Sequence, residues 1–133
     1  MNYLTEPFKL HALGQGWVSM SNEPYAQARI GPIEHATVFH PTPIERSGGN
    51  HYLLESNGNC LGRAQIENLS LMPKSVITVP GPDQGRCHVL VQEMDSGTYK
   101  LDIENGRVVV IEDKLFAAIV ADEPPSSVFK AVF

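Results

Sequence analysis

The side chains that most often carry chemistry in proteins are scattered along this sequence. Five histidines occur without metal-ligand spacing between any two of them: His11, His35, His40, His51 and His88. The two cysteines, Cys60 and Cys87, form no Cys-x-x-Cys motif. The sequence also has no glycine-rich phosphate loop and no nucleophile elbow. We therefore expect no metal, no cofactor and no enzymatic activity.

Charge and composition narrow the classes of partner. The 10 lysines and arginines are spread out and the formal net charge is −5, so no basic stripe is available to neutralise phosphates. Neither nucleic acid nor an anionic membrane is an expected partner. The first residues lack the pattern of a signal peptide, and the longest apolar run, residues 115–121, is too short to span a bilayer. We expect a soluble, cytoplasmic monomer with both cysteines buried and reduced, or else joined in one disulfide.

Short runs rich in β-branched and aromatic residues predict strands that would position any functional loop. They cover residues 51–55, 75–79, 88–93, 98–103, 107–112, 115–120 and 127–133. No stretch of eleven or more residues sustains a helical period. Asn57-Gly58 and Asn105-Gly106 suit tight hairpin turns, because both central residues of such turns need positive φ. The sequence therefore predicts an all-β protein.

Three segments of the chain resemble one another. They begin at Phe8, Tyr52 and Tyr99, and each has an aromatic residue, a nearby leucine, a polar turn with glycine and a second strand. Tyr52 lies 44 residues after Phe8, and Tyr99 lies 47 residues after Tyr52. A unit of roughly 40 residues with about four strands, present three times, predicts a β-trefoil. We expect a single β-trefoil domain over residues 1–133. An ordinary barrel with hairpins that are alike by chance is the alternative.

The third of these units is split between the two ends of the chain. Its hairpin starts near the N-terminus, at Phe8, whereas the strand expected to precede that hairpin lies at residues 128–132. The run Ser47-Gly48-Gly49 has the composition of a flexible joiner. This arrangement predicts a circular permutant, engineered or natural, with the alternative that the glycines belong to a native loop.

Read in the order that starts at Gly49, four stretches carry a resemblance to a known family. They are residues 60–63, 70–76, 97–101 and 114–118. In this order they resemble the mushroom β-trefoil protease inhibitors, that is, the cospin-like serine protease inhibitors and their more distant relatives, the mycocypins. The resemblance implies that the protein occludes the active site of a target protease with an exposed loop on a rigid body.

The resemblance points to residues 62–68 as the reactive loop, because cospin-like members carry a basic residue between their second and third strands. That residue here is Arg63, with Gly62, Ala64 and Gln65 around it. A trypsin-type pocket has an aspartate at its base and needs an arginine or lysine. We therefore expect an inhibitor of trypsin-like serine proteases. The alternative for Arg63 is an exposed side chain at a strand end.

Two further turns are secondary candidates for protease binding. In mycocypins the loop that corresponds to Asn105 and Gly106 can offer asparagine to an asparagine-specific endopeptidase. The loop that corresponds to Asn57 and Gly58 takes part in inhibition of papain-like cysteine proteases. Both pairs also fit ordinary hairpin turns, and the sequence is closer to the serine-protease branch, so a cysteine protease is the less expected target.

Two other functions compete with protease inhibition. Many fungal β-trefoils are lectins, but the chain has one tryptophan, Trp17, and lacks the Gln-x-Trp signature of ricin-type units. A lectin of this sequence would bind a sugar by stacking it on that single aromatic side chain. The second competing interpretation is an engineered, permuted scaffold without activity.

Overall fold

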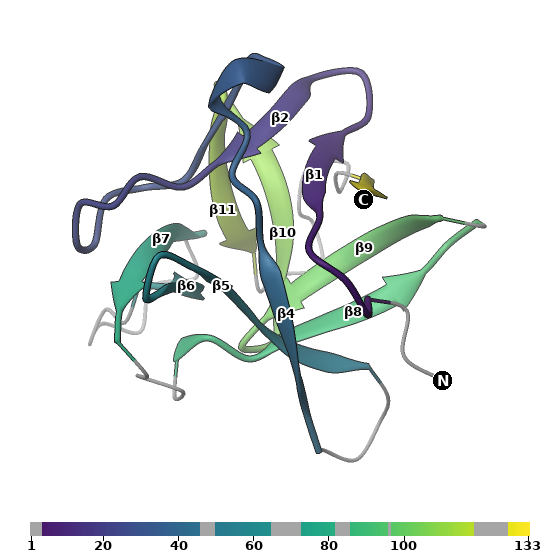
Figure 1. Ribbon diagram of the computed structural model, residues 1–133. Helices are drawn as coiled ribbons and strands as arrows, with labels where there is room; N and C mark the ends of the chain where they lie inside the picture. Colours follow the sequence, from purple (N-terminus) through teal and green to yellow (C-terminus); the bar gives the residue numbers. More distant parts are fainter. Residues whose placement is uncertain (1–3, 46–49, 65–72, 82–85, 96, 119–127) are drawn as a thin grey trace.

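The computed structural model describes residues 4–45, 50–64, 73–81, 86–95, 97–118 and 128–133 (Figure 1). The named elements within these ranges are strands, apart from the 3-10 helix η1 (Ile33–His35). The strands are β1 (Lys9–Ala12), β2 (Gly16–Ser19), β3 (Arg29–Gly31), β4 (His40–Ile44), β5 (His51–Ser56), β6 (Asn59–Arg63), β7 (Lys74–Pro80), β8 (Val89–Glu93), β9 (Thr98–Ile103), β10 (Gly106–Ile111), β11 (Lys114–Ala118) and β12 (Phe129–Val132). No helix in these ranges has the length and apolar character needed to cross a membrane.

Six strands form a closed ring. The antiparallel pairs run β1–β12, β12–β9, β9–β8, β8–β5 and β5–β4. Reciprocal backbone hydrogen bonds between Phe8 and Phe39 join the start of β1 to the segment before β4 and complete the circle. Closure at this bridge makes the ring a barrel, and its interior is filled by side chains.

Three hairpins cap one end of the ring. They are β2–β3, β6–β7 and β10–β11. β11 also pairs with β3 and β7, and an isolated bridge joins Gln27 to Ile77, so each hairpin contacts the other two. A six-stranded ring capped by three hairpins is a β-trefoil, which confirms the predicted fold.

The threefold repeat is complete in chain order. Strands β1–β4, β5–β8 and β9–β12 are three consecutive units, each with two ring strands and one hairpin. β12 pairs with β1 in the way that β4 pairs with β5 and β8 pairs with β9. The predicted circular permutation was argued in part from the strand at residues 128–132, and that strand's pairing with β1 is an ordinary contact between neighbouring units. The structure does not confirm a permuted order. The joiner run at residues 47–49 lies outside the described residues.

The core has a main cluster and a smaller one. The main cluster fills the ring, and its largest fully buried side chains include Tyr52, Phe8, Phe39 and Phe129. The smaller cluster lies between β5, β6 and β7 and contains Leu53, Cys60, Ile77, Val79 and Cys87. Both cysteines are buried thiols, and no disulfide joins them. This second cluster packs the β6–β7 hairpin against β5 within the second unit.

Strand β4 differs from the sequence-based expectation. It lies at His40–Ile44, outside the runs from which strands were predicted, and it contains Pro41 and Pro43. Proline lacks the N–H group that a central strand donates. β4 pairs through a regular ladder with β5 alone, so its outer side needs no donors and both prolines are tolerated.

Candidate functional site

Arg63 is the last residue of β6 and lies opposite Val76 in the β6–β7 ladder. Its side chain is half-buried, and within the described part of the chain no hydrogen bond or ion pair engages it. The backbone on its C-terminal side is also held, because the Ala64 N–H donates to the Ser75 carbonyl at 2.9 Å. Arg63 is therefore a cationic side chain on a fixed backbone, at the point where the β6–β7 connection begins.

The predicted neighbours of Arg63 are part of the protein framework. Gly62 is buried, and a Cβ atom at this position would lie 2.6 Å from Val79 Cγ2 and 2.8 Å from the Arg86 carbonyl oxygen. Glycine is required because the backbone of the neighbouring segment comes so close. Ala64 packs against the smaller core cluster. Gln65, the fourth predicted residue, lies outside the described residues.

The turn between β5 and β6 is exposed, as expected for a secondary candidate. Asn57 has a φ of 53° and Gly58 a φ of 79°, which is the pair of positive φ angles that its sequence predicted. Asn57 Nδ2 donates to Asn22 Oδ1 at 3.3 Å, so this turn contacts the loop between β2 and β3.

The turn between β9 and β10 is shifted by one residue from the prediction. Its central residues are Glu104, with a φ of 48°, and Asn105, with a φ of 67°. Asn105 is exposed, whereas Gly106 is the first residue of β10 and is buried. A Cβ atom on Gly106 would lie 2.8 Å from Ala117 Cβ, so this glycine serves packing and cannot contact a partner. Residues Arg63, Asn57 and Asn105 thus come from three different turns or strand ends.

The loop between β2 and β3 is a candidate that the sequence analysis missed. Backbone hydrogen bonds fix it across β7: Tyr25 N–H to the Thr78 carbonyl at 2.7 Å, Thr78 N–H to the Ala26 carbonyl at 2.9 Å, and Ala28 N–H to the Val76 carbonyl at 2.8 Å. The Thr78 hydroxyl donates to the Ser21 carbonyl at 2.7 Å. These four hydrogen bonds attach the loop to β7 at intervals from Ser21 to Ala28.

Tyr25 stands at the exposed end of this braced loop. Its φ is 64°, a left-handed conformation that costs a bulky residue of the order of 1–2 kcal/mol. The residue is 58% exposed, and the Arg86 guanidinium lies 5.9 Å from the ring centroid. Strain at an exposed aromatic side chain is a signal of function. In the sequence, Ser21-Asn22-Glu23-Pro24 has only the composition of an ordinary turn. It therefore gave no reason to choose this loop as a binding site.

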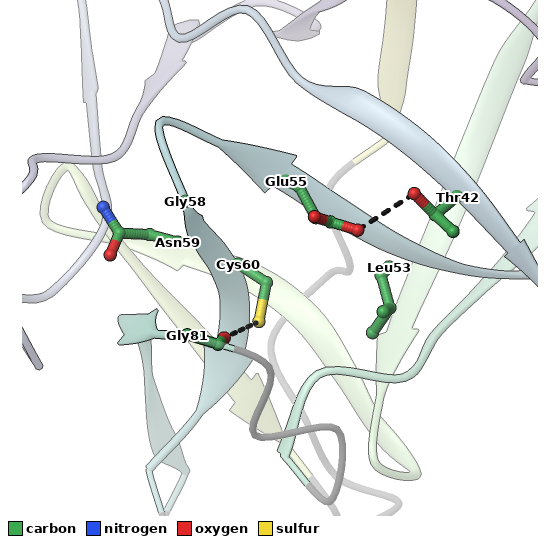
Figure 2. Close-up of a pocket in the computed structure, with 7 residues that line it drawn as sticks. All are labelled: Thr42, Leu53, Glu55, Gly58, Asn59, Cys60 and Gly81. Atoms are coloured by element: carbon green, nitrogen blue, oxygen red, sulfur yellow. Dashed lines mark hydrogen bonds between the residues drawn. The ribbon is translucent and has the colours of Figure 1, made fainter.

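A groove opens beside the β5–β6 turn (Figure 2). It has a volume of about 320 Å³ and is lined by Thr42, Leu53, Glu55, Gly58, Asn59, Cys60 and Gly81. In Figure 2 the Thr42 hydroxyl points at the Glu55 carboxylate, which accepts its hydrogen bond at 2.9 Å. The Cys60 thiol donates to the Gly81 carbonyl at 3.7 Å. No group of three or more potential metal ligands is assembled among the described residues.

Solved structures of low sequence identity share this fold. The designed threefold-symmetric protein ThreeFoil aligns with a TM-score of 0.72 at 15% identity, covering 96% of this chain and 98% of ThreeFoil. A salivary protein from Culex quiquefasciatus, of the Cysteine and Tryptophan-Rich family, aligns at 0.71 and 11% identity, covering 97% and 94% of the two chains. These similarities establish the β-trefoil fold.

A lectin is also among the structures of similar fold. The Polyporus squamosus lectin, solved with a human-type influenza-binding epitope, aligns at a TM-score of 0.64 and 8% identity. The alignment covers 95% of this chain and 48% of the lectin chain. At this identity the similarity concerns the fold alone.

Sequence comparison identifies the family. No curated protein sequence matches the chain significantly. The family described as peptidase inhibitor I66 matches residues 44–129, which is most of the chain and includes β5 to β11. This chain therefore belongs to the peptidase inhibitor I66 family.

Proposed function

We propose that this protein inhibits a trypsin-like serine protease by occluding its active site, and that Arg63 supplies the basic side chain. The family membership supports a protease as the target. The observation that carries the choice of residue is the position of Arg63: a half-buried cation on a backbone held by the ladder to Val76, at the start of an inter-strand connection.

Rigidity is the physical basis of this proposal. An inhibitor loop that is already fixed loses little conformational entropy when it binds, so more of the contact energy appears as affinity. The side chain of Arg63 needs only to extend from its strand end into the protease pocket. Inside that pocket its guanidinium would form a charge-assisted, bidentate pair with the aspartate at the base.

The braced β2–β3 loop is the second segment that we propose to contact the protease. It is exposed at Tyr25 and joined to the β5–β6 turn through Asn22 and Asn57. The two alternative functions have weaker support. Carbohydrate binding is supported only by the fold shared with the Polyporus squamosus lectin, and an inactive scaffold only by the fold shared with ThreeFoil.

An inhibition titration against trypsin tests the role of Arg63. The parent protein should inhibit, Arg63→Ala should lose inhibition, and Arg63→Lys should retain most of it. Arg29→Ala is the matched control, because Arg29 is also an arginine on a strand, exposed and without an ion pair among the described residues. Equal inhibition by the parent and Arg63→Ala would refute the assignment of this residue.

Tyr25→Gly separates the two proposed contact segments. Glycine accepts the positive φ of this position, so the loop backbone keeps its conformation while the aromatic side chain is removed. Weaker inhibition by Tyr25→Gly, with an unchanged far-ultraviolet spectrum, would support contact through the β2–β3 loop. Unchanged inhibition would remove that loop from the interface.

A further inference from the structure

The three units place different residues at one equivalent position. The position is the second-last residue of the first strand of each unit, that is, of β1, β5 and β9. This residue pairs with a residue of the next strand: His11 with Trp17, Glu55 with Cys60, and Asp102 with Arg107. The offsets of 44 and 47 residues between units, already seen at Phe8, Tyr52 and Tyr99, relate His11, Glu55 and Asp102 to one another. The second and third units thus share a carboxylate at this position.

In the third unit a guanidinium neutralises that carboxylate. Arg107 Nε donates to Asp102 Oδ1, and both side chains are mostly buried, at 22% and 18% exposed. Gln92, on the neighbouring strand β8, completes the network: its Oε1 accepts from Arg107 Nη2 at 3.3 Å, and its Nε2 lies 3.5 Å from Asp102 Oδ2. A carboxylate, a neutral donor and a guanidinium thus form one closed polar network.

In the second unit the same network lacks its cation. Thr42 takes the place of Gln92 and donates to Glu55, which takes the place of Asp102. Cys60 stands where the third unit has Arg107. Within the described part of the chain, no lysine or arginine forms an ion pair with Glu55.

The space that an arginine would occupy is open. The groove of about 320 Å³ lies beside Glu55, and Glu55 is the charged member of its lining. Leu53 and Cys60 offer apolar surface, which suits the methylene stem of a basic side chain. The Gly81 carbonyl supplies a further acceptor in its lining. The volume is in the range of natural small-ligand sites.

We propose that this groove binds an alkyl-guanidinium or alkyl-ammonium group, with Glu55 as its counter-ion and Thr42 orienting the carboxylate. Two sources can supply such a group: a free small cation, or an arginine or lysine side chain on the surface of a partner protein. The partner-borne form rests on the proposed function, since the groove adjoins the β5–β6 turn and would receive a basic side chain of the bound protease.

The test is an NMR titration of the isotope-labelled protein with n-propylguanidinium at pH 8. The amide signals of Gly58, Asn59 and Gly81 should shift saturably. n-Propylurea, a neutral molecule of the same shape, should leave these signals unchanged. Shifts of equal size with both probes, or none with propylguanidinium, would overturn the proposal.

Two variants locate the counter-ion. Glu55→Gln should weaken propylguanidinium binding at least about tenfold, whereas the control Glu93→Gln, which alters an exposed carboxylate on β8, should not. Thr42→Val provides a second measurement if Glu55→Gln disturbs folding, and it should weaken binding by a smaller factor. Unchanged binding in both Glu55→Gln and Thr42→Val would refute the site.

The pseudo-threefold relation gives an independent control. Arg107→Ala removes the cation of the third unit and should create a new propylguanidinium site, reported by shifts near Gln92 and Asp102. Failure to gain this second site would contradict the equivalence of the two networks on which the proposal depends.

Protease assays distinguish the two sources of the cation. If Glu55→Gln weakens inhibition of a protease as well as probe binding, the cation belongs to the partner protein. If inhibition is unchanged while probe binding is lost, the groove takes a free cation. If the parent inhibits no protease, the proposed function fails, and the NMR titration still decides whether the groove binds a guanidinium.

Discussion

Glu55 and Asp102 occupy equivalent positions in successive units of the trefoil, yet of the two only Asp102 has an arginine opposite it in its hairpin. The residue opposite Glu55 is Cys60, and the space beside it is a groove. The carboxylate at this position therefore forms a stabilising ion pair in the third unit. In the second unit it remains beside an open groove.

The two carboxylates should differ in their contribution to stability. Asp102→Asn removes the charge that pairs with the mostly buried Arg107, and we expect it to lower the free energy of unfolding by about 1–3 kcal/mol. Glu55→Gln leaves no cation unpaired and should change it by less than about 0.5 kcal/mol. Urea denaturation of both variants gives the comparison, and equal losses would contradict it.

Substitution of Arg63 should change which serine protease the protein prefers to inhibit. Arg63→Phe replaces the cation with an aromatic side chain that suits the hydrophobic pocket of a chymotrypsin-like enzyme. We expect the inhibition constant for trypsin to rise by about 100-fold or more, because the aspartate of its pocket would be buried without a partner. Inhibition of chymotrypsin should appear or improve. Parallel titrations against both proteases measure the two effects, and unchanged preference would exclude Arg63 from the protease pocket.

Gly62 should be essential for stability rather than for contact with a partner. In Gly62→Ala the new Cβ would clash with Val79 and with the Arg86 carbonyl, and we expect a loss of about 1–3 kcal/mol in the free energy of unfolding. Gly31→Ala is the control, since no atom lies within 4 Å of a Cβ at that position and its φ is not positive. The control should be at least as stable as the parent. Similar melting temperatures for the two variants would show that the close approach at Gly62 can relax.

The two thiols should be unreactive in the native protein. Cys60 and Cys87 are 3% and 0% exposed, in an apolar cluster. A thiol-specific reagent should label neither of them at a measurable rate under native conditions and both in denaturant, because buried thiols are shielded from reagents and less readily ionised. Rapid labelling of one thiol in the native protein would mean that the smaller core cluster opens readily.

The local pattern of the sequence was sufficient for the fold. The spacing of Phe8, Tyr52 and Tyr99 gave the threefold unit, because each of these aromatic residues begins an equivalent strand whose inward face must be filled. The turn at Asn57-Gly58 followed from its composition, since few residue pairs accept two positive φ angles. The turn is decided within a few residues of chain, where local sterics dominate, and the repeat can be read because each unit carries the same local pattern.

Only the tertiary structure decided which strands form a unit and which side chains meet. The pairing of β12 with β1 is an ordinary contact between units, so the split third unit did not require moved chain ends. The bracing of Tyr25 depends on hydrogen bonds to Thr78, more than fifty residues away along the chain. The groove beside Glu55 also depends on the tertiary structure, because it brings Thr42, Leu53 and Gly81 together from separate parts of the chain. These relations follow from packing across the threefold axis, where strand register and chain closure determine the neighbours of each side chain.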